Sequence, residues 1–165
     1  MSLSAVTKIG HISQENGYFL TCAESCTGGW IAQTLTTISG SSAWFDRGFV
    51  TYSNTSKQQM LGVKKVSLEK YGAVSEPVIK EMAIGALKNS EAQISIAVSG
   101  IAGPGGGTIE KPIGTVWIAW AFDFNRDGVY RCETHCGHFA GDRQAVRQQT
   151  VDFSLQRLLS ILTEH

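Results

Sequence analysis

The sequence predicts an α/β fold, a three-layer α/β/α sandwich built on a mixed sheet with a C-terminal antiparallel hairpin. Three features of the chain support this prediction. Short segments rich in β-branched and aromatic residues alternate with segments whose apolar residues recur at helical spacing. Two late strand segments follow each other directly, with a turn sequence between them. No internal repeat and no linker-like stretch divides the chain, so we expect one domain over residues 1–165.

The first part of the chain alternates between helix and strand. Residues 4–14 carry apolar side chains at helical spacing and predict an opening helix. Residues 18–20 predict the start of a buried strand, and residues 28–38 predict a helix after a glycine-containing turn. A second strand is expected over residues 49–53, followed by a short helix that Asn54 can cap.

The second part adds one long helix and three strands. Residues 75–77, Ser-Glu-Pro, form a strong helix start, and the apolar face that follows continues to about residue 88. Residues 94–99 predict a strand of small and β-branched side chains. Two further strands are expected at 114–124 and 129–139.

The end of the chain is expected to form a hairpin and a helix. Residues 125–128, Asn-Arg-Asp-Gly, are a turn signal between antiparallel strands. In the second of these strands, apolar or small side chains alternate with polar ones, which indicates one buried and one solvated face. The last helix is expected to start near Asp142 and to bury Val151, Leu155, Leu158 and Leu162.

Composition excludes several classes of partner. The formal net charge is zero and no basic run occurs, which argues against binding of nucleic acid or of a membrane surface. The first residues lack the basic segment and apolar stretch of a signal peptide, and no apolar run reaches membrane-spanning length. We therefore expect a cytoplasmic protein.

The cysteines raise the question of a metal site. They form two pairs with the same spacing, Cys22/Cys26 and Cys132/Cys136, and two histidines lie near the second pair. The second pair falls on a predicted strand, where residues four apart are separated by about 13 Å and cannot bind one ion together. We therefore predict reduced thiols and no metal.

Three loops are expected to meet at one edge of the sheet, because each follows or flanks the end of a strand. They comprise residues 24–29, 40–57 and 99–108, and in such sheets ligands bind at the carboxyl ends of the strands. Their hydroxyl side chains are those of Ser25, Thr27, Ser41, Ser42, Ser53, Ser99 and Thr108.

Lys57 is the only lysine near the middle of these loops, and no histidine is placed to pair with a serine. His11 and His165 are near the termini, and His135 and His138 are on or beside a late strand. A serine activated by a lysine remains as a catalytic arrangement, since a desolvated lysine can accept a proton. The alternative is that Lys57 is a solvated lysine of a surface helix.

The two glycine-containing loops each allow a functional and a structural interpretation. In the turn at 24–29, Thr27 is well placed to cap the helix, and free N–H groups would suit an anion or an oxyanion. The alternative is a well-capped structural turn. Residues 103–107 match no nucleotide-binding fingerprint, and form either a flexible loop or backbone that closes tightly over a ligand. Candidate phosphate contacts are Lys111, Arg143 and Arg147.

Seven short motifs together resemble the CinA C-terminal domain family, over the chain from about residue 18 to the end. The matching segments are residues 23–29 (AESCTGG), 40–43 (GSSA), 48–54 (GFVTYSN) with Lys57, 72–75 (GAVS), 99–104 (SGIAGP), 111–116 (KPIGTV) and 141–143 (GDR). The chain resembles the form that lacks the larger N-terminal CinA domain of many relatives.

The resemblance implies an activity and a set of residues. Members of this family are nicotinamide mononucleotide deamidases, which hydrolyse the pyridine carboxamide to a carboxylate and ammonia without metal or cofactor. It implies that Ser42 is the nucleophile, Lys57 the general base and Tyr52 a further catalytic residue. The substrate-binding residues that it suggests are Glu24, Ser25, Thr27, Gly28, Gly29, Ser99, Gly100, Gly103, Thr108 and Arg143.

Specific roles follow from the chemistry of that substrate. N–H groups of residues 27–29, or of Ser42 and Ala43, are candidates for an oxyanion hole. Glu24 is expected to oppose the cationic pyridinium, and Arg143 or the glycine-rich loop to hold the phosphate. The resemblance also suggests a homo-oligomer. The alternatives are a non-catalytic nucleotide-binding module and a competence- or damage-related interaction subunit.

Overall fold

The computed structural model describes residues 3–164. The elements follow in the order α1 (Leu3–Asn16), β1 (Leu20–Glu24), α2 (Trp30–Leu35), a 3-10 turn η1 (Ser41–Ala43), β2 (Phe45–Val50), α3 (Asn54–Leu61), α4 (Lys65–Tyr71), α5 (Glu76–Lys88), β3 (Ile94–Gly100), β4 (Thr115–Phe122), β5 (Arg131–His138) and α6 (Arg143–Glu164).

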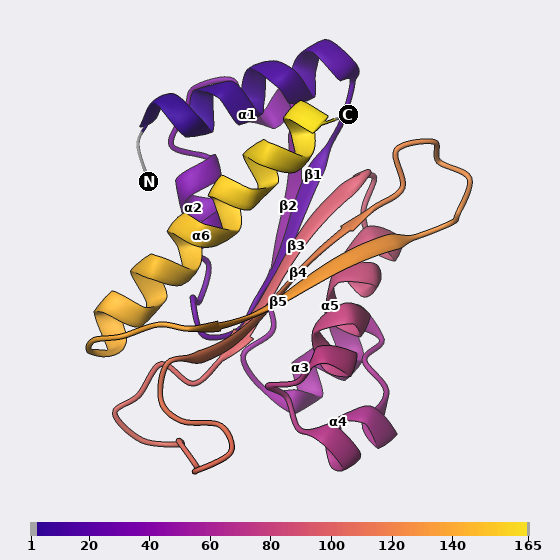
Figure 1. The fold of residues 1–165 in the computed structure, drawn as a ribbon. Helices are drawn as coiled ribbons and strands as arrows, with labels where there is room; N and C mark the ends of the chain where they lie inside the picture. Colours follow the sequence, from indigo (N-terminus) through magenta and orange to yellow (C-terminus); the bar gives the residue numbers. More distant parts are fainter. Residues whose placement is uncertain (1–2, 165) are drawn as a thin grey trace.

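The strands form one mixed sheet in the order β2-β1-β3-β4-β5. β1 lies between β2 and β3 and is parallel to both, whereas β4 and β5 form the antiparallel hairpin. Figure 1 shows α1, α2 and α6 on one face of the sheet and α3, α4 and α5 on the other. The predicted α/β fold with a mixed sheet and a C-terminal hairpin is confirmed.

Alternation along the central strands supplies both halves of the core. Cys22 of β1 and Ile96 of β3 pack in the apolar cluster beneath α1, α2 and α6. Ala23 and Ala97, their neighbours in sequence, pack against α5 in the other cluster. Every residue of β1 is buried, as expected for a parallel strand covered on both faces.

β2 begins and ends earlier than the sequence predicted. The strand spans Phe45–Val50 rather than residues 49–53, because its parallel register pairs Phe45 with Leu20 and Val50 with Glu24. The chain then turns directly into α3. Ser53, not Asn54, caps that helix, since its hydroxyl accepts a hydrogen bond from the Ser56 N–H.

Two helices also differ from expectation. α2 is a short helix of 6 residues, Trp30–Leu35, rather than a helix over 28–38. α4 was not expected, because its 7 residues carry too short an apolar pattern to be recognised.

Among the described residues, no helix combines the length and the apolar character needed to cross a membrane.

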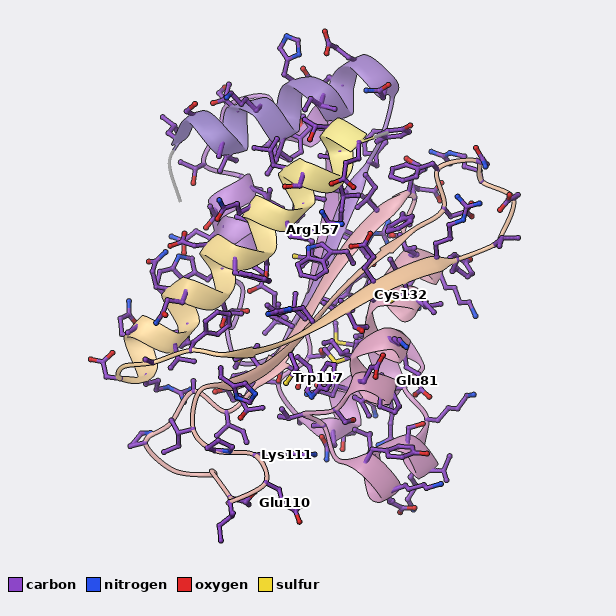
Figure 2. All side chains as sticks on the ribbon, in the orientation of Figure 1. Glu81, Glu110, Lys111, Trp117, Cys132 and Arg157 are labelled. Carbon is purple, nitrogen blue, oxygen red and sulfur yellow. The ribbon has the colours of Figure 1, made fainter. Side chains whose placement is uncertain are left out.

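β5 is an edge strand whose polar face is covered in part by α6. The Arg157 guanidinium on α6 pairs with the Glu133 carboxylate at 2.7 Å, and the His135 ring stacks on Phe153 at 4.5 Å between centroids. Figure 2 shows Arg157 over this side of the sheet and Cys132 on β5 nearer to α5. The polar face expected to be solvated keeps Arg131 and His135 exposed and Glu133 half-buried, with α6 lying across part of it.

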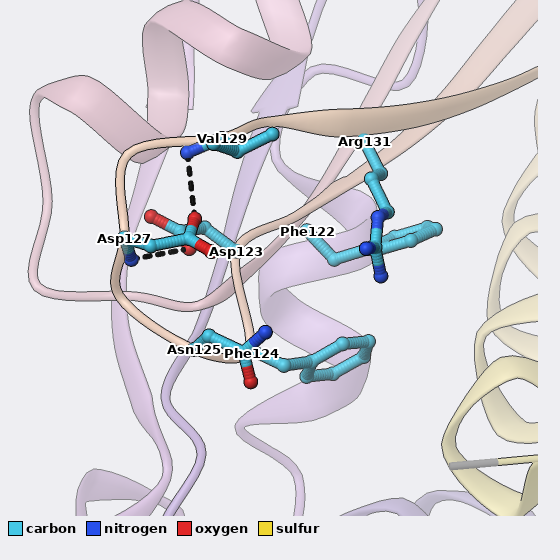
Figure 3. Close-up of a pocket in the computed structure, with 7 residues that line it drawn as sticks. All are labelled: Phe122, Asp123, Phe124, Asn125, Asp127, Val129 and Arg131. Carbon is cyan, nitrogen blue, oxygen red and sulfur yellow. Dashed lines mark hydrogen bonds between the residues drawn. The ribbon is translucent and has the colours of Figure 1, made fainter.

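The hairpin turn is held by carboxylates. Asp123 accepts hydrogen bonds from the N–H groups of Asp127 and Gly128, and Asp127 accepts one from the Val129 N–H. Figure 3 shows the contacts of Asp127 with Asp123 and with Val129 beside a hollow of about 20 Å³. That volume holds no more than a water molecule, so the hollow offers no ligand site.

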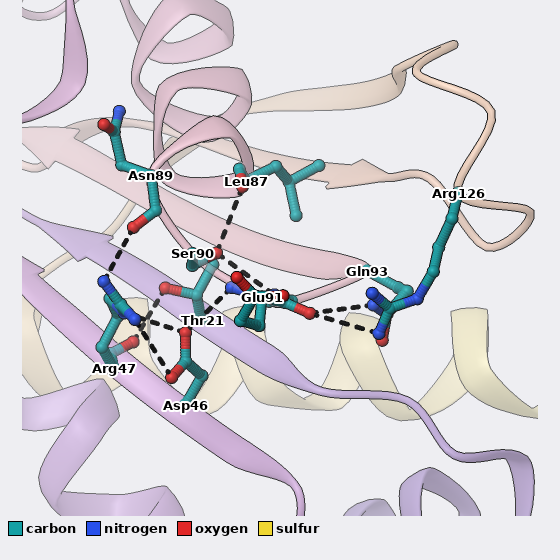
Figure 4. Close-up of polar contacts among 10 residues, drawn as sticks. Thr21, Asp46, Arg47, Leu87, Asn89, Ser90, Glu91, Gln93 and Arg126 are labelled. Atoms are coloured by element: carbon teal, nitrogen blue, oxygen red, sulfur yellow. Dashed lines mark hydrogen bonds and ion pairs between the residues drawn. The ribbon is translucent and has the colours of Figure 1, made fainter.

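A polar network closes the amino end of the parallel strands. Arg47 at the start of β2 pairs with Asp46 at 2.8 Å and donates to the Asn89 carbonyl at 3.1 Å. Asp46 accepts from the Glu91 N–H, and Arg126 of the hairpin loop donates to the Glu91 carbonyl. Figure 4 shows this network joining β2, the α5–β3 loop and the hairpin loop, which leaves the carboxyl end as the functional edge.

Close packing of α3 against α5 provides a test of the fold. A Cβ atom placed on Gly85 of α5 lies 2.0 Å from the Leu61 carbonyl oxygen of α3. Gly85→Ala is expected to lower the free energy of unfolding by about 2 kcal/mol, because overpacking against backbone outweighs the gain in helix propensity. Urea denaturation measures this change. Gly105→Ala, which meets no atom within 4 Å, serves as the control, and a Gly85→Ala protein as stable as the parent would contradict the packing.

Candidate active site

A serine and a lysine meet at the carboxyl edge of the sheet. Ser25 directly follows β1, the middle one of the three parallel strands, and Lys57 projects from the first turn of α3. The Lys57 Nζ lies 3.1 Å from the Ser25 Oγ and 2.8 Å from the Thr51 carbonyl oxygen. Ser25 is half-buried, so its hydroxyl lies at the border between the core and solvent.

The surroundings of Lys57 favour its neutral amine. The residue is only 1% exposed, and within residues 3–164 no carboxylate forms an ion pair with it. Burial therefore lowers the pKa of Lys57 from its ordinary value of 10.5, although the nearby Cys26 opposes this in part. A neutral lysine beside a serine hydroxyl has the arrangement of a general base and its nucleophile.

The Glu24 carboxylate, expected from the sequence to oppose the pyridinium, is engaged by backbone N–H groups of the chain itself. Its carboxylate is 1% exposed and accepts hydrogen bonds from the N–H groups of Gly29, Ile31 and Ala32 at 3.1, 3.0 and 2.8 Å. The Thr27 hydroxyl donates to the same carboxylate. Glu24 thus satisfies the free donors at the start of α2 and places a negative charge at the positive end of the helix dipole.

The same contacts change the interpretation of Thr27 and the 27–29 backbone. Thr27 is fully buried and its hydroxyl donates to Glu24, so its side chain caps no helix N–H. Gly29 donates its N–H to Glu24, and Gly28 donates its N–H to the Ser25 carbonyl. Within the described part of the chain, the N–H groups of Cys26 and Thr27 donate no hydrogen bond and are the unengaged donors of this turn.

Ser42 is not brought together with Lys57. It is exposed in η1, before the start of β2, whereas Lys57 follows the end of that strand. β2 has 6 residues, and a parallel strand of that length spans about 20 Å. The structure therefore separates the expected nucleophile from the expected base and places Ser25 beside the base instead.

Arg143 links the loops that surround Ser25. Its guanidinium donates to the Gly103 carbonyl at 2.8 Å and to the Tyr52 hydroxyl at 2.8 Å. Tyr52 is 60% exposed, and no contact joins its hydroxyl to Ser25 or Lys57 in the described residues. Arg143 therefore joins the glycine-rich loop to the segment that follows β2.

The other two candidate phosphate contacts support the backbone. Arg147, one turn after Arg143, donates to the carbonyls of Cys26 and Thr27 at 3.0 Å each and lies over the Trp30 ring. Lys111 donates to the Tyr71 carbonyl at 2.8 Å. Reasoning from the sequence missed this clamp on the turn, although the spacing of the two arginines along one helix was a usable signal.

The remaining candidate residues separate into buried and exposed groups. Ser99 is 1% exposed, and a Cβ on Gly100 would lie 2.5 Å from a Val116 methyl group. Thr108 is exposed, and its hydroxyl accepts a hydrogen bond from the Lys111 N–H.

A polar hollow of about 320 Å³ opens beside the turn that follows β1. The residues that line it are Thr27, Gly28, Gly29, Trp30, Gln33, Gln144 and Arg147.

The cysteines form no cluster. All four are free thiols; Cys22 and Cys26 are buried, whereas Cys132 and Cys136 are half-buried on β5. Burial raises the pKa of the Cys26 thiol to about 11, so this neighbour of Ser25 is protonated at neutral pH. In residues 3–164 no three His, Cys, Asp or Glu side chains gather as a metal-ligand set.

The role of Glu24 gives a testable prediction. In Glu24→Gln the amide NH₂ replaces one acceptor oxygen and points at N–H donors, so buried donors lose their partners. The free energy of unfolding is expected to fall by about 3 kcal/mol or more, as measured by urea denaturation. Glu110→Gln, at an exposed loop position labelled in Figure 2, should leave stability unchanged. Equal stability of the two variants would contradict the role of Glu24 as the acceptor of the N–H groups at the start of α2.

Comparison with known proteins agrees with this architecture. Nicotinamide-nucleotide amidohydrolase PncC of Enterobacter agglomerans is 55% identical over 152 residues, which cover 92% of this chain and 90% of that protein. The Pseudomonas putida protein of the same name is 48% identical over 159 residues, 96% of this chain and 95% of the relative. The crystal structure of competence/damage inducible protein CihA from Agrobacterium tumefaciens superposes with a TM-score of 0.90 at 42% identity, covering 99% of each chain.

The family assignment follows from the extent of the match. The sequence model described as CinA C-terminal domain matches residues 3–162, which include both Ser25 and Lys57 and every strand of the sheet. The chain belongs to the CinA C-terminal domain family.

Proposed function

We propose that this protein hydrolyses the carboxamide of nicotinamide mononucleotide, giving nicotinate mononucleotide and ammonia. Relatives that are 48 to 55% identical carry the name nicotinamide-nucleotide amidohydrolase. The observation that carries the proposal is the contact between Lys57 Nζ and Ser25 Oγ at 3.1 Å. A reaction on this nucleotide fits the cytoplasmic location expected from the sequence, and a homo-oligomeric state stays a prediction.

The chemistry proceeds through an acyl-enzyme. Neutral Lys57 takes the Ser25 proton as the Ser25 Oγ attacks the carboxamide carbon. The tetrahedral intermediate collapses, the C–N bond breaks, and Lys57 returns the proton to the leaving nitrogen, which departs as ammonia. A water molecule then attacks the ester carbon while Lys57 accepts its proton. The ester C–O bond breaks, Lys57 returns that proton to the Ser25 Oγ, and the carboxylic acid is released and ionises to the carboxylate.

The turn after Ser25 supplies support for the developing oxyanion. Its unengaged N–H groups, those of Cys26 and Thr27, adjoin the nucleophile, and Arg147 fixes their peptide units through the carbonyl oxygens. Such preorganised donors stabilise a tetrahedral intermediate without further rearrangement.

Arg143 is the proposed contact for the nucleotide phosphate. It is exposed at the start of α6, and its two bonds to Gly103 and Tyr52 leave further N–H donors toward solvent. A guanidinium held in this way presents a planar fork that matches phosphate oxygens. In this scheme Glu24 supports the turn and has no contact with the pyridinium.

Ser25→Ala tests the nucleophile. Ammonia release from nicotinamide mononucleotide is expected to fall by at least about 10³-fold, since the covalent route is lost, while urea denaturation shows a folded protein. Ser42→Ala is the matched control, because it removes an exposed hydroxyl at the other end of β2 and should retain parental turnover.

The opposite result would reassign the reaction. If Ser42→Ala were inactive and Ser25→Ala active, the nucleophile would be Ser42 in a conformation different from this one. Binding of the nucleotide by calorimetry without any ammonia release by the parent protein would instead indicate a non-catalytic module.

The pH dependence of the reaction follows from Lys57. Because burial lowers the pKa of Lys57 from 10.5, the amine becomes neutral at a lower pH than that of an ordinary lysine. The kcat/KM value is therefore expected to rise with pH through this lowered pKa. The folded protein releases this proton at lower pH than the unfolded chain, so the Lys57 contribution to folding stability also rises with pH between the two pKa values. A pH–rate profile checks this, and a midpoint at or above 10.5 would contradict a buried base.

A further inference from the structure

Three hydroxyl-bearing residues form a row across the three parallel strands. The Ser25 N–H donates to the Val98 carbonyl, which places Ser25 directly opposite Ser99 in the parallel ladder. The Thr51 N–H donates to the Glu24 carbonyl, which places Thr51 opposite Ser25 on the other side. The order across the sheet is therefore Thr51, Ser25, Ser99.

The row faces α3 and α5. Ala23 and Ala97, two residues before Ser25 and Ser99, both pack in the cluster that contains α5, and side chains two apart on a strand share a face. The contact of Ser25 with Lys57, which comes from α3, agrees with this placement. Ser99 thus lies beside Ser25 on the side away from Thr51, whose carbonyl holds Lys57.

Ser99 is a buried serine, 1% exposed, whose hydroxyl forms no hydrogen bond within the described residues. Ser95, four residues earlier on the same face, is also buried but donates to the Ala83 carbonyl at 2.8 Å. A buried hydroxyl without a partner destabilises a fold, so its presence next to the proposed nucleophile calls for a functional reason.

We propose that Ser99 is a positioning residue that donates a hydrogen bond to the Ser25 Oγ during the reaction. Adjacent strands are about 4.8 Å apart, and staggered rotamers that turn two serine hydroxyls toward each other bring their oxygens within hydrogen-bond distance. With one lone pair of Ser25 engaged by Ser99, the Ser25 proton points at Lys57. The same bond stabilises the negative charge that develops on Ser25 as the proton leaves.

The inference rests on the proposed function only in taking Ser25 as the nucleophile. It adds a chain of three groups, Ser99 to Ser25 to Lys57, in which Ser99 neither touches the substrate nor exchanges a proton with it. An effect of Ser99 should therefore appear in the rate at which Ser25 reacts and leave substrate binding unchanged.

Ser99→Ala is the test, with ammonia release and folding stability measured on the same protein. The kcat value is expected to fall about tenfold with KM unchanged, as for the loss of one hydrogen bond to a charged group. The urea midpoint is expected to stay equal or to rise, because the substitution removes an unpartnered buried hydroxyl. Ser154→Ala is the matched control, since its hydroxyl is also buried and unpartnered but lies on α6 within the other core cluster, and it should keep the parental kcat.

A second readout is independent of the substrate. Labelling of Ser25 by phenylmethylsulfonyl fluoride, followed by mass spectrometry, is expected to slow in Ser99→Ala by a similar factor. Parental kcat and parental labelling in Ser99→Ala would overturn the role of Ser99. A parent protein that labels at Ser25 but releases no ammonia would overturn the proposed substrate alone, and the labelling comparison would still decide the role of Ser99.

Discussion

The positions of Ser25 and Lys57 at the carboxyl edge of the sheet depend on the buried carboxylate of Glu24. This residue ends β1, which lies between the other two parallel strands, and accepts hydrogen bonds from backbone N–H groups at the start of α2. A helix of 6 residues is too short to be stable without such support. By holding α2 and Thr27 together, Glu24 sets the path of the turn in between, and that path presents Ser25 to Lys57.

Much of the fold was predictable because it depends on local patterns. The apolar periodicity of α5 and α6, the β-branched composition of β3 and the turn residues of the hairpin each indicate one structure. The extent of β2 was not predictable in this way. Its bounds depend on the register with β1, which pairs Phe45 with Leu20, and no local preference encodes that register.

The candidate site shows the same division. The loops that meet at the carboxyl edge, and Lys57 as a basic group among hydroxyls, could be inferred from the order of strands and helices. Which serine lies beside Lys57 could not, since Ser25 and Ser42 are both small hydroxyl residues in glycine-containing motifs. The same holds for Glu24. A carboxylate in a loop motif suggests a ligand contact, and only the structure shows that backbone donors surround it.

The two arginines at the start of α6 have a consequence for how the protein is made. Arg147 reaches the Cys26 carbonyl across 121 residues of sequence, and Arg143 reaches Tyr52 across 91. A nascent chain that has emerged only as far as β5 therefore contains Ser25 and Lys57 but lacks the side chains that brace their loops. Bracing of these loops therefore requires synthesis and docking of the start of α6, and a chain that ends before Arg143 cannot form these contacts.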